Sequence, residues 1–293
     1  MLDFVFTHIV REPERAMKMR QPVGERIRFN LILSMCIWLL FDLCPYQGYG
    51  QGSEKERVKF EEFTFREIEA LGKRGTTVFI PVAQIEAHGP HLPVGAHLFC
   101  AEGICTRAAR SSHGIVGVPI TLGDCLDFAA WPGYIVINTQ TLMEIFKHYC
   151  ESLQNQGFKR LIFFSCAGGN VMNTLSLAAG EHLKSHPNGD IVLAQLGNLL
   201  TQQTVQTIQK QDADILTSMM LALRPALMVV GKDSIRIKGD LTLLRQASRF
   251  RKGYELSAWF PDAVFQAKKG SRKEIGEQII FDASEGLRKL ASE

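Results

Sequence analysis

Apolar and polar positions along residues 54–293 predict helices and strands in alternation. Short, continuous apolar runs are typical of strands covered on both faces, and they occur at 76–82, 115–120, 161–165 and 191–196. Helical spacing of apolar residues occurs at 63–71, 98–110, 139–156, 170–183, 213–223 and 274–290. A short extended piece is expected at 134–137, and residues 226–268 give no clear pattern. The alternation predicts an α/β fold in which helices cover both faces of a mostly parallel central sheet.

The strongest helix signal is that of residues 139–156. Thr139 or Thr141 is expected as its N-cap, and Gly157 as the residue that stops it. In a sheet of this kind, sites lie outside the carboxyl ends of the strands. The segments that follow Val82 and Ser165 are therefore the first places to look for chemistry.

Residues 1–50 differ in character from the rest of the chain. Three arginines between residues 20 and 28 precede an apolar run at 31–41, and Gly48 and Gly50 follow it. This layout predicts a signal peptide cleaved after Gly50, because the apolar run is shorter than the roughly 20 residues that a membrane span needs. We therefore expect an exported protein, periplasmic or extracellular, without a stable membrane span after cleavage. Residues 51–293 would then form a single domain; an uncleaved anchor or an amphipathic cap is the alternative for residues 1–50.

Composition and charge narrow the possible partners. Charged residues make up 22% of the chain and apolar residues 46%, which is ordinary for a globular protein, and the net charge is +3. So small and dispersed a charge argues against a nucleic-acid surface. Seven cysteines become five once Cys36 and Cys44 leave with the signal peptide, so at least one thiol stays unpaired.

The candidate chemistry is concentrated directly after the first predicted strand. Glu86, His88, His91 and His97 place one carboxylate and three imidazoles within twelve residues, on a Gly/Pro-rich segment that cannot be helical. Carboxylates and imidazoles are the usual ligands of transition metals and the usual acid–base groups. The segment therefore predicts a metal or acid–base site.

Residues 81–93 (PVAQIEAHGPHLP) resemble the signature of the creatininase (creatinine amidohydrolase) family. Four further segments resemble family motifs in the right order, and the resemblance covers almost all of residues 60–290. These segments are Gly123 with 131–133, 157–170, 217–221 and 273–276. The resemblance implies a three-layer α/β/α fold with a mostly parallel central sheet, assembled as a homohexamer. It also implies a two-metal site that activates water for attack on a cyclic amide or a related C–N bond.

Carried over residue by residue, the resemblance places Glu86 and His88 at the family's first two metal ligands and His91 at the next histidine of the signature. His97 falls on the family's bridging aspartate, although imidazole bridges two ions far less readily than a carboxylate. Other ligand or catalytic positions are occupied by Ala167, Gln211, Leu216 and Phe128. The two-metal site implied by the family is therefore expected to be degenerate.

Two interpretations follow, from different classes. In the first, the chain is a pseudoenzyme or weakly active scaffold that binds a small molecule or assembles as a homo-oligomer, with Phe128 and Leu216 filling the former cleft. In the second, it is a metal-dependent amidohydrolase whose reduced centre of Glu86, His88 and His97 holds at most one Zn, Mn or Fe ion. His91 would then orient groups or transfer protons.

A changed chemistry that uses the thiol of Cys125 or Cys166 is a third possibility. Substrate contacts are predicted at Gly168, Gly169, Asn170 and Trp131. Backbone amides at a helix start can bind an anion or oxyanion, although the two glycines also suit a turn with positive φ. Trp131 equally suits a core or subunit contact.

Overall fold

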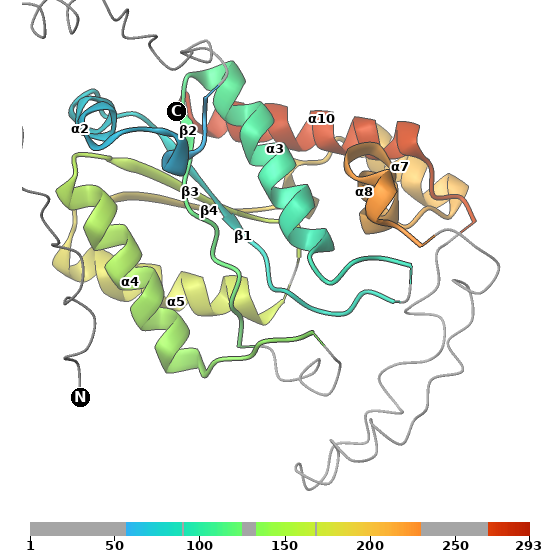
Figure 1. Ribbon diagram of the computed structural model, residues 1–293, viewed down its shortest axis with the longest axis horizontal. Coiled ribbons are helices and arrows are strands. Elements are labelled where there is room, and N and C mark those ends of the chain that lie inside the picture. Colours follow the sequence, from blue (N-terminus) through green and yellow to red (C-terminus); the bar gives the residue numbers. More distant parts are fainter. Residues whose placement is uncertain (1–56, 90, 125–132, 168, 230–268) are drawn as a thin grey trace, which may run out of the picture. The chain divides into compact units, whose positions relative to one another are not determined.

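The computed structural model describes residues 57–89, 91–124, 133–167, 169–229 and 269–293 (Figure 1). Several predictions fall outside these ranges and stay predictions. They concern the signal peptide, Cys125, Phe128, Trp131 and Gly168.

Within the described ranges, no helix combines the length and the apolar character that a membrane span requires.

Within the described ranges, four parallel strands form the central sheet. They are β1 (Val78–Val82), β2 (Ile115–Val116), β3 (Arg160–Ser165) and β4 (Asp190–Gln195), in the spatial order β2-β1-β3-β4. In register, Val78 lies between Ile115 and Leu161, and the pairing of β1 with β3 ends at Val82 and Ser165. The carboxyl ends of β1 and β3 therefore lie side by side.

The second strand is shorter than the predicted span of 115–120. It ends at Val116, and Ile120 makes only an isolated bridge with Val82. Pro119 has no backbone N–H to donate to a neighbouring strand, which explains why the ladder does not continue through it.

Helices cover both faces of the sheet (Figure 1). One face carries α4 (Thr139–Asn155) and α5 (Asn170–Ser185), and the other carries α3 (Ala96–Ser112) and α10 (Lys273–Leu290). The remaining elements are α2 (Phe65–Lys73), α6 (Leu196–Leu199), α7 (Gln202–Gln211), α8 (Ile215–Leu223) and the 3₁₀ turns η1 (Phe60–Glu62) and η3 (Pro225–Leu227). The predicted three-layer α/β/α arrangement is thus confirmed.

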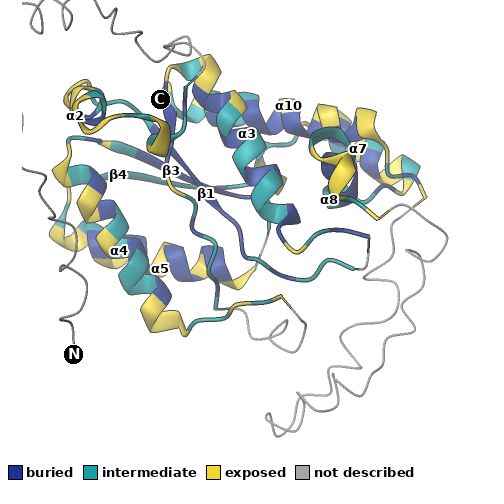
Figure 2. Ribbon diagram, in the orientation of Figure 1, coloured by how far each residue is buried: buried dark blue, intermediate teal, exposed yellow. Residues whose placement is uncertain are grey.

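Strand β1 is buried along its whole length (Figure 2). Successive strand residues point to opposite faces of the sheet and so supply two separate cores. Phe79 and Phe164 pack in the core under α3, α8 and α10, whereas Ile80 and Phe163 pack in the core with α4 and α5. This two-sided burial is the physical reason why the strands of this sheet are continuous apolar runs.

One prediction about helix ends is wrong. The N-cap of α4 is Asn138 rather than Thr139 or Thr141, and the Asn138 side chain accepts a hydrogen bond of 2.8 Å from the backbone N–H of Thr141. Asparagine caps at least as well as threonine, so both threonines lie inside the helix. The predicted end of this helix at Gly157 is confirmed, because α4 ends at Asn155 and Gly157 adopts a positive φ of 94°.

Candidate metal centre

The loop after β1 carries three of the predicted residues, and α3 carries the fourth. Backbone N–H groups of Ala83 and Ile85 donate to the carbonyls of Ile120 and Thr121, and the N–H of Glu86 donates to the carbonyl of Val94. These bonds hold the loop at the carboxyl end of a central strand. This is where the sequence predicted a site.

Glu86, His88 and His97 converge in space. Their potential ligand atoms all lie within 4.8 Å of one another. Oε1 of Glu86 lies 3.3 Å from Nε2 of His88 and 3.3 Å from Nδ1 of His97, and the centroids of the two imidazole rings are 4.1 Å apart. The structure therefore brings together the three residues that the sequence proposed as metal ligands.

Three polar atoms of this group are buried without a hydrogen-bond partner among the described residues. They are Oε2 of Glu86, which is only 4% exposed as a residue, Nε2 of His88 and Nδ1 of His97. Buried polar atoms are almost always satisfied in proteins, so three such atoms in one place suit a bound ion or ligand. One carboxylate and two imidazoles are a donor set that suits a divalent transition-metal ion. The residues present fit such an ion.

The electrostatics favour the protonation states that metal binding requires. Burial alone would raise the pKa of Glu86, but the adjacent side chains of His88 and His97 lower it to about 2. Burial is also the main reason why the pKa of His97 is lowered. An ionised carboxylate beside a neutral imidazole is the form in which both groups donate electron pairs to a cation.

His97 presents Nδ1 to Glu86, and that atom is separated from the backbone by as many bonds as an aspartate oxygen would be. A histidine at this position can therefore reach where the family's bridging aspartate reaches. Its single lone pair serves one ion, whereas a carboxylate has two oxygens. The geometry thus agrees with a centre for one ion.

His91 lies outside this donor group. It is 5% exposed, and its Nε2 lies 2.9 Å from Oγ1 of Thr217 in α8, while its Nδ1 is buried without a partner within the described ranges. Burial lowers the pKa of His91, and the negative charge of Asp214 opposes that shift.

Asp214 and Thr217 were not among the predicted site residues. Asp214 is the N-cap of α8, and its Oδ1 accepts a hydrogen bond from the Thr217 N–H at 2.6 Å. An aspartate directly before a helical apolar run is a recognised N-cap signal. That signal predicts the cap, but it does not show that α8 contacts the loop that follows β1.

Two of the predicted substrate contacts can be placed. Gly169 is the N-cap of α5 with a positive φ of 104°, and Asn170 is the first residue of that helix. Both are exposed at the carboxyl end of β3, next to the end of β1. The positive φ supports the interpretation of Gly169 as a turn residue, and the position leaves a substrate contact open.

The structure gives less support to a reactive thiol and to further metal ligands at the remaining family positions. Burial raises the pKa of the Cys166 thiol well above its ordinary value, which disfavours the reactive thiolate. Ala167 has no donor atom, and Leu216 packs against the core under α3 and α10. Gln211 ends α7, and its buried Oε1 has no hydrogen-bond partner among the residues that the structure describes. Among the described residues, Glu86, His88 and His97 form the one group of three metal-binding side chains.

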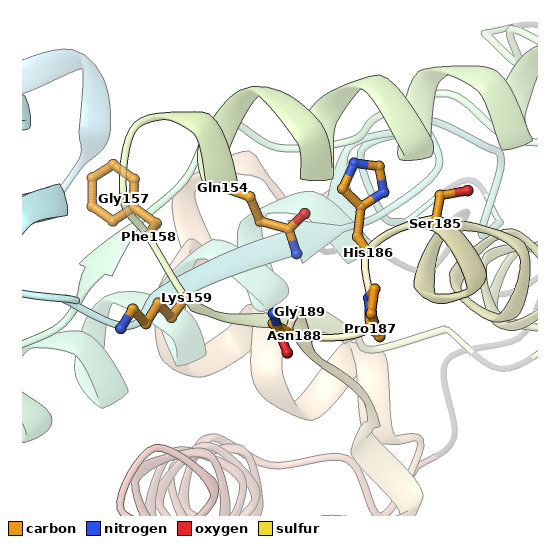
Figure 3. A pocket seen from close by; sticks show the side chains of 9 residues that line it. All are labelled: Gln154, Gly157, Phe158, Lys159, Ser185, His186, Pro187, Asn188 and Gly189. Carbon is orange, nitrogen blue, oxygen red and sulfur yellow. The ribbon is translucent and has the colours of Figure 1, made fainter.

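A separate open cleft of about 630 Å³ lies at the other edge of the sheet, where residues 157–159 lead into β3 and Gly189 precedes β4 (Figure 3). Gln154 and His186 also line it. It contains none of the predicted site residues, and parallel α/β sheets place their sites at the carboxyl edge. The candidate centre is therefore the cluster around Glu86.

Fold and site together define an α/β/α protein with a candidate metal centre at the carboxyl edge of its sheet. The sequence model of the creatininase family, described as creatinine amidohydrolase, matches residues 61–291, and the chain belongs to this family.

Solved structures of the same fold agree. A creatininase mutant complexed with creatine aligns with a TM-score of 0.65 at 19% identity, covering 80% of this chain and 97% of that one. A manganese form of creatininase aligns with a TM-score of 0.63 at 20% identity, with the same coverage. At these identities the similarity shows the fold.

Curated relatives are more partial matches. The mycofactocin precursor peptide peptidase of Mycobacterium ulcerans is 27% identical over 126 residues, which cover 36% of this chain and 50% of the relative. Its counterpart from Mycolicibacterium smegmatis is 28% identical over 100 residues, covering 32% and 40%. The chain thus spans half or less of the length of these relatives.

Proposed function

We propose that this protein is a metal-dependent hydrolase that binds one divalent ion through Glu86, His88 and His97 and cleaves a C–N bond of the cyclic-amide type. The observation that carries the proposal is the convergence of Glu86, His88 and His97, each of which has a buried polar atom without a hydrogen-bond partner among the described residues. The creatinine amidohydrolases and the peptide peptidases among the similar proteins are both named for hydrolysis of C–N bonds. This shared bond type supports the reaction class.

A bound divalent ion would supply a Lewis acid and lower the pKa of a water molecule. Glu86 and His97 are held in the forms that donate electron pairs, as their pKa shifts indicate. His91 lies outside the donor group and is available to orient a reacting group or to exchange a proton with it. The exposed start of α5 at Gly169 and Asn170 lies on the same edge and would contact the substrate.

A second candidate function is that of a scaffold that binds a small molecule or assembles without catalysis. It is favoured by the lack of donor atoms at Ala167 and by the packing of the partly buried Leu216 against the core. A two-ion centre needs about five ligands. The described residues provide one group of three, so a chemistry that depends on two ions is disfavoured.

Metal content of the purified full-length chain separates the two candidates. After reconstitution with Zn, Mn or Fe we expect about one ion per chain, and we expect Glu86→Ala and His88→Ala to lose it. His148→Ala is the matched control, because His148 is exposed on α4 and should leave the metal content unchanged.

Absence of stoichiometric metal in the wild-type chain would reject the hydrolase and favour the scaffold. Metal that persists in both ligand variants would show that ions bind elsewhere. A loaded protein that hydrolyses neither cyclic amides nor peptides would reject catalysis while retaining the metal site.

A further inference from the structure

The ring of His91 is held at one nitrogen only. Nε2 of His91 lies 2.9 Å from Oγ1 of Thr217, which is 3% exposed. Nδ1 of His91 is buried and has no partner in the part of the chain that the structure describes. The backbone carbonyl of His91 accepts a hydrogen bond from the N–H of Val229 at 3.1 Å. The carbonyl and one ring nitrogen are therefore anchored, and Nδ1 is the side-chain atom that has no partner among the described residues.

The number of available hydrogens decides which nitrogen carries the proton. A neutral imidazole has one N–H group and one lone pair, and a threonine hydroxyl has one hydrogen. If Thr217 donates its hydrogen to Nε2, the proton of His91 is on Nδ1, and only this Nδ1–H lacks a partner. If Nε2–H donates instead, both the buried Thr217 hydrogen and the Nδ1 lone pair lack partners.

Each buried polar group without a partner destabilises the fold, so the first arrangement is favoured. A threonine in a helix can also donate to the carbonyl four residues earlier. Within the described part of the chain, Thr217 makes no such side-chain bond, and His91 is the partner of its hydroxyl.

The cap of α8 fixes where the Thr217 hydroxyl lies. Asp214 accepts the Thr217 N–H at 2.6 Å, and the Asp214 N–H in turn donates to Oγ of Ser271 at 2.9 Å. Thr217 is in the first turn of α8, so the capped turn holds its side chain against His91. The start of α8 thus contacts the loop that follows β1 through the hydroxyl group of Thr217.

We propose that Thr217 is a positioning residue that holds neutral His91 in the Nδ1–H tautomer. In this form Nδ1 has no lone pair, so it neither binds an ion nor accepts a proton. It donates a hydrogen bond to an oxygen or nitrogen of whatever ligand occupies the site. The role of His91 in the proposed hydrolase, on which this inference rests, is then that of a donor to the substrate rather than a base.

The tautomer can be read directly from long-range ¹H–¹⁵N correlation spectra of the full chain labelled at histidine. We expect the His91 signals, assigned by their loss in His91→Gln, to show a protonated Nδ1 and an unprotonated Nε2. Thr217→Val removes the hydroxyl at nearly constant shape and should shift His91 toward the Nε2–H form. Thr217→Ser restores the hydroxyl and should restore the Nδ1–H form.

A protonated Nε2 in the neutral wild-type His91 would overturn the proposal, whether or not Thr217→Val folds. An unchanged tautomer in a folded Thr217→Val protein would overturn the role of Thr217. Metal content serves as the separate readout, because Thr217→Val should keep the ion that Glu86→Ala loses. A metal-free wild type with Nδ1–H on His91 would reject the proposed hydrolase and leave the tautomer assignment standing.

Discussion

At the residue scale, we expect that changing residue 97 alone does not change how many ions the candidate centre holds. His97→Asp would replace Nδ1 with a carboxylate oxygen at a similar reach and would restore the family's bridging group. We still expect about one ion per chain, because the side chains of Ala167 and Leu216 have no donor atom. Metal analysis after reconstitution with excess Zn or Mn checks the number.

Two ions bound to His97→Asp would contradict this prediction, since it would mean that ligands outside the described residues complete a second site. His97→Ala is the control, because it removes the donor atom and should weaken binding of the single ion by about 10-fold or more.

At the residue scale, the sequence predicts the ligands better than it predicts their surroundings. Glu86, His88 and His97 are close in the chain, so their spacing alone indicated a common site. Thr217 is 126 residues from His91, and no local pattern connects the two segments. Such contacts depend on how α8 packs against the rest of the domain, which a single sequence does not specify.

At the element scale, the packing of α10 against α8 depends on a glycine. A Cβ built on Gly276 would lie 1.9 Å from the backbone oxygen of Ser218, which cannot move away without shifting α8. We expect Gly276→Ala to lower the free energy of unfolding by about 1–3 kcal/mol, despite the higher helix propensity of alanine. Urea unfolding followed by circular dichroism measures the change.

Gly180 in α5 is the matched control. It is also inside a helix, but a Cβ there would meet no atom within 4 Å. Gly180→Ala should therefore stabilise the protein by roughly 0.5–1 kcal/mol. Equal effects of the two substitutions would show that close approach of α8 and α10 is not what requires Gly276.

The sequence predicts helices and strands accurately where both faces of the element are buried or where one face is strongly apolar. Strands β1 and β3 and helices α4 and α10 agree with their apolar patterns to within a few residues. Helix α7 was missed because its sequence is largely polar and only Thr204 and Ile208 are buried. An element that buries so few side chains leaves almost no periodic signal.

At the scale of the whole molecule, the alternation of strands and helices was enough to predict the layered fold, because parallel strands need helical crossovers. The family match over residues 61–291 confirms that prediction. Export, cleavage after Gly50 and assembly as a homohexamer stay predictions. Each depends on residues or surfaces that strand and helix periodicity does not describe.

Stability against acid is a property of the whole molecule that one buried carboxylate should influence. Asp282 in α10 is 6% exposed, and its Oδ2 accepts hydrogen bonds from the backbone N–H and the hydroxyl of Thr201, the N-cap of α7. Burial alone would raise the pKa of Asp282, but the bonds from Thr201 and neighbouring groups lower it overall. The ionised form is therefore more favoured in the folded state than in the unfolded state.

The direction of the pH dependence follows from that difference. A carboxylate with a lowered folded-state pKa contributes stability that is fully present above its unfolded-state pKa of about 3.9, and this stability disappears as the pH falls through the folded-state value. We expect Asp282→Asn to destabilise the protein by about 1–3 kcal/mol at pH 7, with a difference from wild type that shrinks as the pH falls from about 5. Urea unfolding at a series of pH values measures that difference.

Glu277 is the matched control, because it is an exposed carboxylate on the same helix. Glu277→Gln should change the stability by less than about 1 kcal/mol. A difference for Asp282→Asn that stays constant down to pH 3 would mean that the lost contacts, rather than the ionisation of Asp282, cause its effect.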